Sequence, residues 1–240
     1  MYEGPIIDAF LHGPWIGSAH DLTRADRADW GHDRRLRRVM KTFRHEGADG
    51  AATNFRDVDA VLREMGSSRI GNAILAVKVY HPAGADAVAA LNRAFGEIAA
   101  ASGGKLKWIA TLIPPDLGAG TYWDLMQNPR MLDDLAGLPG LCGVHITPSP
   151  WGIRPNDRWF YPAYAKCAEL GLPVYAYVGA PGPLWPMDLN NPTHLDDVAL
   201  AFPDLTIVAH HIGDPWTDVS GLIGPDVFRY CTVCCRLTFV

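Results

Sequence analysis

Two adjacent histidines, His210 and His211, follow a short apolar run at the point where a predicted strand gives way to a loop. Leu205 to Ala209 is apolar, contains β-branched residues and is bounded by turn residues, which predicts a buried strand. Side chains alternate along a strand, so His211 is predicted to share a face with Ile207 and Ala209. We therefore expect His211 to point to a central site and His210 to face the surrounding helices.

Two further predicted strands carry groups that could do chemistry. The strand Pro5 to Leu11, continued to the next residue, places Asp8 and His12 on one face. An acid and an imidazole on an inner face are costly to bury unless they are paired or bind something; the alternative is that His12 only caps the strand end in a loop. The strand Leu141 to Ile146 presents His145 on an inner face.

Strands and helices alternate along the chain, which predicts βαβ units and parallel strands. The sequence contains no G-x-G-x-x-G and no G-x-x-x-x-G-K-[ST], so a nucleotide-binding sheet loses its main support. The strands repeatedly end in Pro, Gly or His, where a (β/α)8 barrel carries its site. We predict a TIM-type (β/α)8 barrel that is apparently truncated after about seven strands. The predicted strands are Pro5–Leu11, Ala73–Tyr80, Leu106–Ile113, Leu141–Ile146, Leu172–Val178, Leu205–Ala209 and Asp226–Cys234.

Composition and length limit the classes of protein to consider. We expect one domain over residues 1–240, with a long loop insertion at 13–54 and an atypical C-terminus at 226–240. The net charge of −5 argues against a nucleic-acid partner. No apolar run is long enough to span a membrane and the first residues do not resemble a secretory signal, so a cytoplasmic protein is expected. An incomplete barrel exposes strand edges, which predicts aggregation or an edge-paired homodimer.

Several segments between about Pro5 and Trp216 come in an order that is typical of one family. These are Ile7-Asp8-Ala9-Phe10-Leu11-His12, Phe160-Tyr161-Pro162-Ala163-Tyr164, Cys167-Ala168-Glu169-Leu170, Gly171-Leu172-Pro173-Val174, Phe202-Pro203-Asp204-Leu205 and His211-Ile212-Gly213-Asp214-Pro215-Trp216. On these segments the chain resembles the amidohydrolase-related (amidohydrolase 2) family, the metal-dependent TIM-barrel group that includes aminocarboxymuconate semialdehyde decarboxylase.

Carried over position by position, the family's site is only partly present. The family usually has Asp-x-His-x-His on its first strand, a metal-binding histidine after the fifth, a catalytic histidine on the sixth and an aspartate on the eighth. Asp8 and His12 match the first motif, but Phe10 replaces its first histidine. Tyr177 occupies the fifth-strand position and His211 the sixth, and the final aspartate has no counterpart.

The resemblance implies roles for these residues. His211 would transfer protons, Asp8 would orient His12 or a bound water, and Tyr177 would donate a hydrogen bond to an anionic substrate oxygen. The expected cofactor is a divalent metal, most simply zinc, held by His12 with His145 as a replacement ligand. Because phenylalanine cannot ligate and neutral tyrosine is a poor ligand, the alternative is a site without metal.

The implied activity is hydrolysis or non-oxidative decarboxylation of a small carboxylated or lactone-like compound, with aromatic-derived compounds among the candidates, and that small molecule is the expected partner. Trp15, Trp151 and Trp216 lie in or beside strand-end loops and are expected to line an aromatic-friendly substrate pocket; ordinary packing under loops is the alternative for each. The competing functional reading is a catalytically impaired, metal-free barrel remnant that only binds a small acid or a partner.

Overall fold

The computed structural model describes residues 4, 6–12, 58–77, 79, 84–115, 124–180, 185–211, 213, 215 and 216, with the side chains of Phe10 and His12 left out. The predicted insertion at 13–54 and the atypical terminus at 226–240, including the predicted seventh strand, lie outside these residues.

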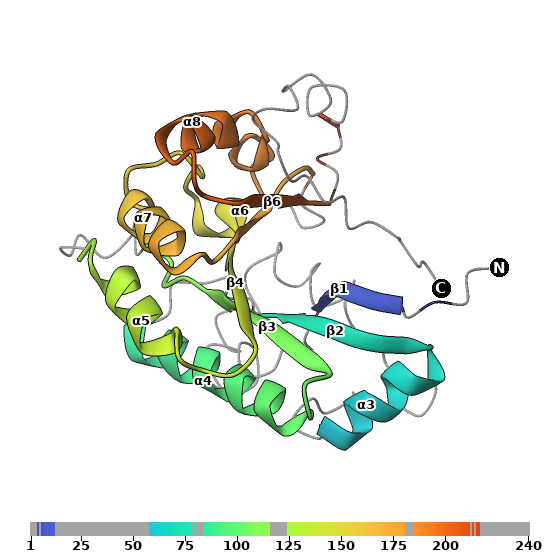
Figure 1. The fold of residues 1–240 in the computed structure, drawn as a ribbon. Coiled ribbons are helices and arrows are strands. Elements are labelled where there is room, and N and C mark those ends of the chain that lie inside the picture. The colour runs from blue at the N-terminus through green and yellow to red at the C-terminus, as the bar shows by residue number, and fades with distance from the viewer. Residues whose placement is uncertain are drawn as a thin grey trace, which may run out of the picture.

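Within the described residues, six parallel strands form one sheet in which the spatial order follows the order in the chain. They are β1 (Ile6–His12), β2 (Ile70–Ala76), β3 (Leu106–Thr111), β4 (Leu141–Ile146), β5 (Val174–Tyr177) and β6 (Ile207–His210). The sheet is curled (Figure 1), and β1 and β6 are its two edges among the described strands. The predicted (β/α) barrel is confirmed as a curled half-barrel.

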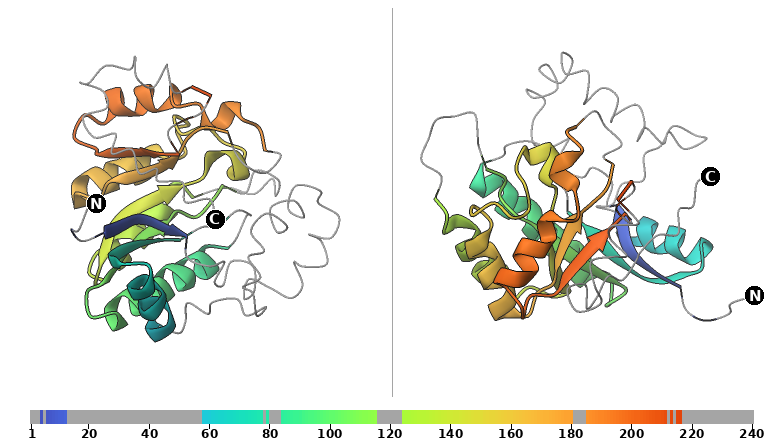
Figure 2. Two further views of the ribbon diagram at one scale, coloured as in Figure 1. Left: turned by 90° about the vertical axis from the view of Figure 1, so that its right-hand side faces the viewer. Right: turned by 90° about the horizontal axis from the view of Figure 1, so that it is seen from above.

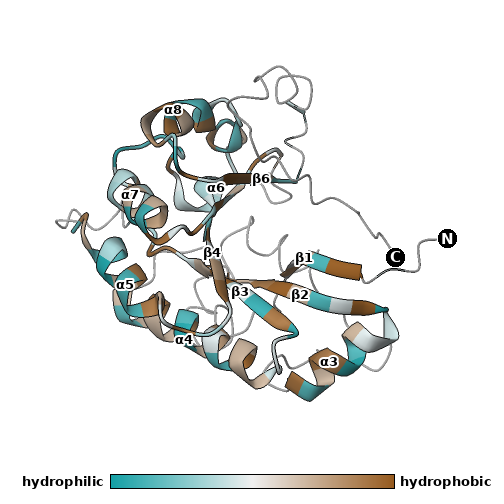
Figure 3. Ribbon diagram, in the orientation of Figure 1, coloured by the Kyte–Doolittle hydropathy of each residue, from teal (hydrophilic) through white to brown (hydrophobic). Residues whose placement is uncertain are grey.

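Helices connect the strands and cover the outer face of the sheet (Figures 1 and 2). They are α3 (Val58–Ser67), α4 (Ala85–Ala101), α5 (Gln127–Leu135), α7 (Tyr161–Leu170) and α8 (His194–Ala201), with the short α6 (Pro148–Trp151) and the 3-10 helix η1 (Asp188–Asn190) in loops. Hydrophilic and hydrophobic residues intermix along these helices, as in amphipathic helices that cover a sheet (Figure 3). None of the described helices is long and apolar enough to cross a membrane.

The two faces of the sheet differ in character. Alternate strand residues such as Leu75, Ala110, Val144 and Ala176 belong to one buried hydrophobic cluster with helix residues such as Leu91. This cluster is the core, and it lies between the sheet and its helices. The intervening strand residues therefore face the concave side, where the barrel would have its interior.

Candidate active site

Two histidines from different strands meet on the concave face. The Nε2 atoms of His145 in β4 and His210 in β6 lie 3.1 Å apart, and both side chains are buried, at 0% and 2% exposure. Strand β5 lies between β4 and β6, and strands two positions apart in a sheet are about 10 Å apart. Side chains can close that gap only where the sheet is concave, so the curl of the sheet creates this contact.

Strand register explains why these two residues are able to meet. His145 pairs with Tyr175, and Tyr177, two residues further along the same face of β5, pairs with His210. The His145 and His210 side chains are therefore on the same face of the sheet, at positions that differ by two residues along the strand direction. The neighbouring positions Val144 and Ala176 carry the apolar side chains of the opposite, helix-covered face.

Tyr177 and His211 complete the cluster. The His211 ring centroid is 4.4 Å from that of Tyr177 and 4.6 Å from that of His210, and Tyr177 meets His210 edge-on at 5.5 Å. His211 follows the end of β6 and has a positive φ of 75°. Residues other than glycine seldom adopt this backbone conformation. The turn at this residue brings its ring beside Tyr177. We define these four residues, His145, Tyr177, His210 and His211, as the histidine–tyrosine cluster.

The prediction that His210 faces the helices is wrong. The alternation was assigned with the wrong phase: Ile207 and Ala209 pack into the helix-covered core, which leaves His210 on the concave side. A strand inside a barrel is apolar on both faces, so composition alone does not distinguish them. The register against β5 settles the orientation, because Ala209 pairs with the apolar Ala176 of the helix-covered face, and this register is a property of the folded sheet. The predicted residues His145, Tyr177 and His211 do come together, and His210 joins them.

Asp8 and His12 are not linked by the simple alternation that was expected. The register with β2 is irregular between Asp8 and Leu11: Asp8 pairs with Ala73 and Leu11 with Leu75. Three steps along β1 thus correspond to two along β2, as in a β-bulge, which interrupts the alternation of side chains. His12 pairs through its backbone with Ala76, and its side chain lies outside the described part of the structure.

Three buried asparagines bond backbone groups at or just after the carboxyl ends of β3, β4 and β5. Asn92 in α4 bonds both backbone groups of Thr111, and Asn128 in α5 bonds both backbone groups of Ile113. Asn190 accepts a hydrogen bond from the backbone of Ser149 and donates one to the carbonyl of Gly179. These bonds satisfy buried backbone groups at the carboxyl end of the sheet.

The tryptophans expected to line a substrate pocket have different surroundings. Trp151 is buried, packs against Phe160 with ring centroids 5.9 Å apart and donates its indole hydrogen bond to the carbonyl of Val79. This environment favours ordinary packing over substrate contact. Trp216 is half-buried and bonds through its backbone to Gly213, whereas Trp15 lies outside the described residues.

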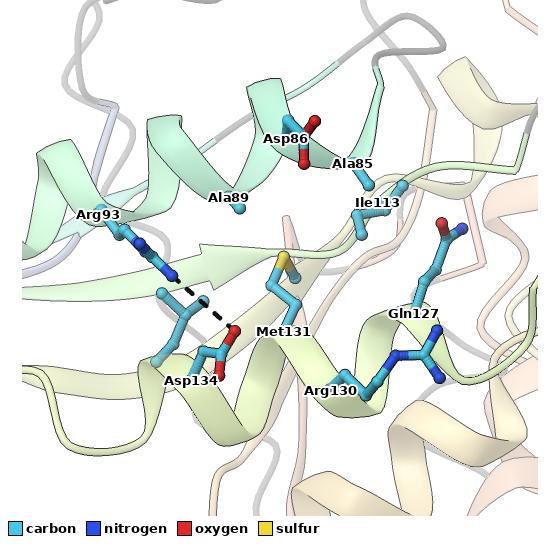
Figure 4. Close-up of a pocket in the computed structure, with 10 residues that line it drawn as sticks. Ala85, Asp86, Ala89, Arg93, Ile113, Gln127, Arg130, Met131 and Asp134 are labelled. Atoms are coloured by element: carbon cyan, nitrogen blue, oxygen red, sulfur yellow. Dashed lines mark ion pairs between the residues drawn. The ribbon is translucent and has the colours of Figure 1, made fainter.

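A pocket with a volume of about 230 Å³ lies away from the cluster, between α4 and α5. Figure 4 shows Arg93 of α4 reaching toward Asp134 of α5, and Met131 and Ile113 also line the pocket. It is on the helical outside of the sheet, whereas barrel enzymes carry their sites at the carboxyl ends of the strands. It is therefore not the candidate active site.

The metal ligands implied by the family do not fit this chain. Phe10 has no ligating atom, and Tyr177 offers a phenol where an imidazole is needed. Among the described residues, no three His, Cys, Asp or Glu side chains gather as a group that could hold a metal. The joint ligand role predicted for His12 and His145 stays a prediction.

Comparison with known proteins places this geometry in context. Residues 42–227, more than three quarters of the chain, match the family described as Amidohydrolase. No protein with a curated description matches the sequence.

Solved structures share the fold at low sequence identity. An uncharacterised TIM-barrel protein from Bordetella bronchiseptica is 23% identical with a TM-score of 0.58, over 90% of this chain and 70% of that one. The 5-carboxyvanillate decarboxylase from Sphingomonas paucimobilis is 19% identical with a TM-score of 0.59, over 87% and 67% of the two chains. A variant of the 5-carboxyvanillate decarboxylase from Novosphingobium aromaticivorans, 15% identical with a TM-score of 0.58 over 88% and 66%, was solved with manganese and a substituted nitrobenzoic acid.

Proposed function

Because this chain belongs to the amidohydrolase family, as its sequence resemblance predicted, we propose that it hydrolyses or non-oxidatively decarboxylates a small carboxylated compound, an aromatic carboxylate being the first class to test. The observation that carries the proposal is the histidine–tyrosine cluster on the concave face. It comes from the carboxyl ends of β4, β5 and β6, where barrels of this kind place their chemistry.

The cluster supplies the groups that such a reaction needs. Loss of CO2 from an aromatic ring requires a proton at the carbon that carried the carboxylate, and an imidazole can deliver it. We assign that proton transfer to His211, the family's sixth-strand position. Tyr177, whose ring lies 4.4 Å from that of His211, would donate its phenolic hydrogen bond to a substrate oxygen. Asp8 and His12 remain proposed orienting residues on β1.

Zinc is the metal we propose for an active form, and manganese is the alternative suggested by the Novosphingobium relative.

A specific observation also supports a second function, which is binding without turnover. Phe10 and Tyr177 stand where the resemblance requires histidines, so the family's ligand set is depleted. In that case the same concave face would hold a small acid but not transform it.

The test is turnover of a panel of aromatic carboxylates, including 5-carboxyvanillate, measured by ultraviolet absorbance and CO2 release with and without added Zn²⁺ or Mn²⁺. Replacing His211 by asparagine should lower kcat by about 100-fold or more, the usual contribution of a proton-transfer group. His194→Asn is the matched control, because His194 lies at the start of α8 beside Asp188. Measurable binding by calorimetry without turnover would favour the binding protein over the enzyme.

A further inference from the structure

We propose that His145 and His210 form a two-histidine binding site for a divalent transition metal, at positions different from the family's ligands. The site would lie between β4 and β6, on the concave face. It goes beyond the proposed reaction, because it concerns metal binding by two named side chains and can be measured without a substrate.

The distance between the two nitrogens carries this inference. Two imidazoles bound to one tetrahedral zinc ion at about 2.0–2.1 Å have their nitrogens about 3.3 Å apart. The two Nε2 atoms are 3.1 Å apart, so a separation larger by a few tenths of an ångström, together with a rotation of both rings that directs their lone pairs at one point beside the line between the nitrogens, would give the spacing of two zinc ligands. The ring planes are tilted by 38°, with centroids 5.1 Å apart; the rings meet through their nitrogens rather than stacking face to face.

The tautomers of the His145 and His210 rings also permit metal binding. In the hydrogen-bonded pair one Nε2 donates its hydrogen and the other accepts it. When the donor ring moves its hydrogen to Nδ1, both Nε2 atoms present lone pairs and both rings stay neutral. Binding a metal ion therefore exchanges one hydrogen bond for two metal–nitrogen bonds without changing the charge of either ligand.

The charge of the site indicates what else would bind there. Two neutral imidazoles leave the full positive charge on a divalent ion, and two ligands leave coordination positions open. A carboxylate is a favourable occupant of those positions, because it neutralises the ion and offers oxygen ligands. Imidazole ligands suit zinc, copper and nickel better than magnesium or calcium.

The experiment titrates the wild-type chain with Zn²⁺ alone by calorimetry and repeats the titration on His145→Gln, His210→Gln, His211→Gln and His194→Gln. We expect one zinc per chain. Loss of either proposed ligand should weaken binding by at least about 100-fold, more than the loss of an outer hydrogen-bond partner. His211→Gln and His194→Gln should stay within about threefold of the wild type. Unchanged affinity in His145→Gln, loss in His211→Gln but not in His210→Gln, or no binding by the folded wild type would overturn the proposal.

A second measurement keeps the test decisive if the buried variants do not fold. Cu²⁺ bound to the doubly substituted His12→Gln, His211→Gln protein should show two coordinated imidazoles by pulsed electron paramagnetic resonance. One coordinated imidazole, or none, would overturn the site.

The metal site and the proposed reaction can fail separately. Zinc binding without turnover of any tested carboxylate would contradict the proposed reaction and leave the two-histidine site unaffected. Turnover that persists in His145→Gln and His210→Gln, although these variants no longer bind zinc, would support the reaction and show that this metal has no role in it.

Discussion

The side-chain amide of Asn92 in α4 bonds both backbone groups of Thr111 in β3, with N···O distances of 2.9 and 3.0 Å. Asn92 is fully buried, so this pair of bonds satisfies a backbone N–H and a carbonyl that are shielded from water. One side chain thereby joins a covering helix to the carboxyl end of the sheet.

Replacing Asn92 by alanine should destabilise the protein by about 2–4 kcal/mol, because it leaves a buried N–H and a buried carbonyl without their partner. Denaturant unfolding followed by circular dichroism measures the change. The control is Asn156→Ala, which removes an exposed bond to Asp197 and should cost less than about 1 kcal/mol. Equal losses in the two variants would show that the buried bonds are not special.

Gly143 in β4 is predicted to be intolerant of any side chain. A Cβ atom there would lie 2.6 Å from Cε2 of Tyr175 and 2.8 Å from the carbonyl oxygen of Pro173. Gly143→Ala should therefore destabilise the fold by about 1–3 kcal/mol through overpacking. Gly137→Ala, where nothing lies within 4 Å of the added atom, is the matched control and should be nearly neutral. A thermal melt compares them, and a neutral Gly143→Ala would refute the close packing of β4 on β5.

The two described thiols should react slowly at neutral pH. Burial raises the pKa of Cys142 to about 11 and that of Cys167 to about 12. Only the thiolate is nucleophilic, so alkylation by iodoacetamide should accelerate roughly tenfold per pH unit between pH 8 and 10. The variant to label keeps these two cysteines and replaces Cys231, Cys234 and Cys235 by serine.

The sign for stability follows from the same pKa values. Both thiols have a higher pKa in the folded state than an exposed thiol, whose pKa is about 9. Their contribution to stability is therefore present below about pH 9 and is lost as the pH rises toward 11 and 12. In the labelling experiment, guanidine-unfolded protein is the control, and its cysteines should react quickly with iodoacetamide. A labelling rate of the folded protein that does not change from pH 8 to 10 would contradict the assigned burial.

Regular elements with strong periodicity were predictable from the sequence. The predicted strand Leu106–Ile113 contains β3 (Leu106–Thr111), and the predicted strand Leu141–Ile146 is β4 with the same bounds. In both cases the pattern of apolar residues is unambiguous, and a glycine or proline follows closely after the end. The parallel sheet and the family followed from the order of these elements.

The site was less predictable, for a physical reason. Periodicity states that His210 and His211 face opposite ways, but it does not state which one faces inward when both faces of the strand are buried. The positive φ of His211 then brings both rings to one side, which no alternation rule would predict. The register irregularity after Asp8 is likewise a property of the pairing with β2 and leaves no mark in the sequence.

The central claim is that the histidine–tyrosine cluster is where this chain binds its small carboxylate. The most direct test is nuclear magnetic resonance of the ¹⁵N-histidine-labelled protein during titration with 5-carboxyvanillate, in the presence of Zn²⁺, with signals assigned by single His→Gln variants. The account predicts saturable shifts of the ring signals of His145, His210 and His211 and no shift of His194. Shifts confined to His194, or none in the cluster when the ligand binds, would contradict it.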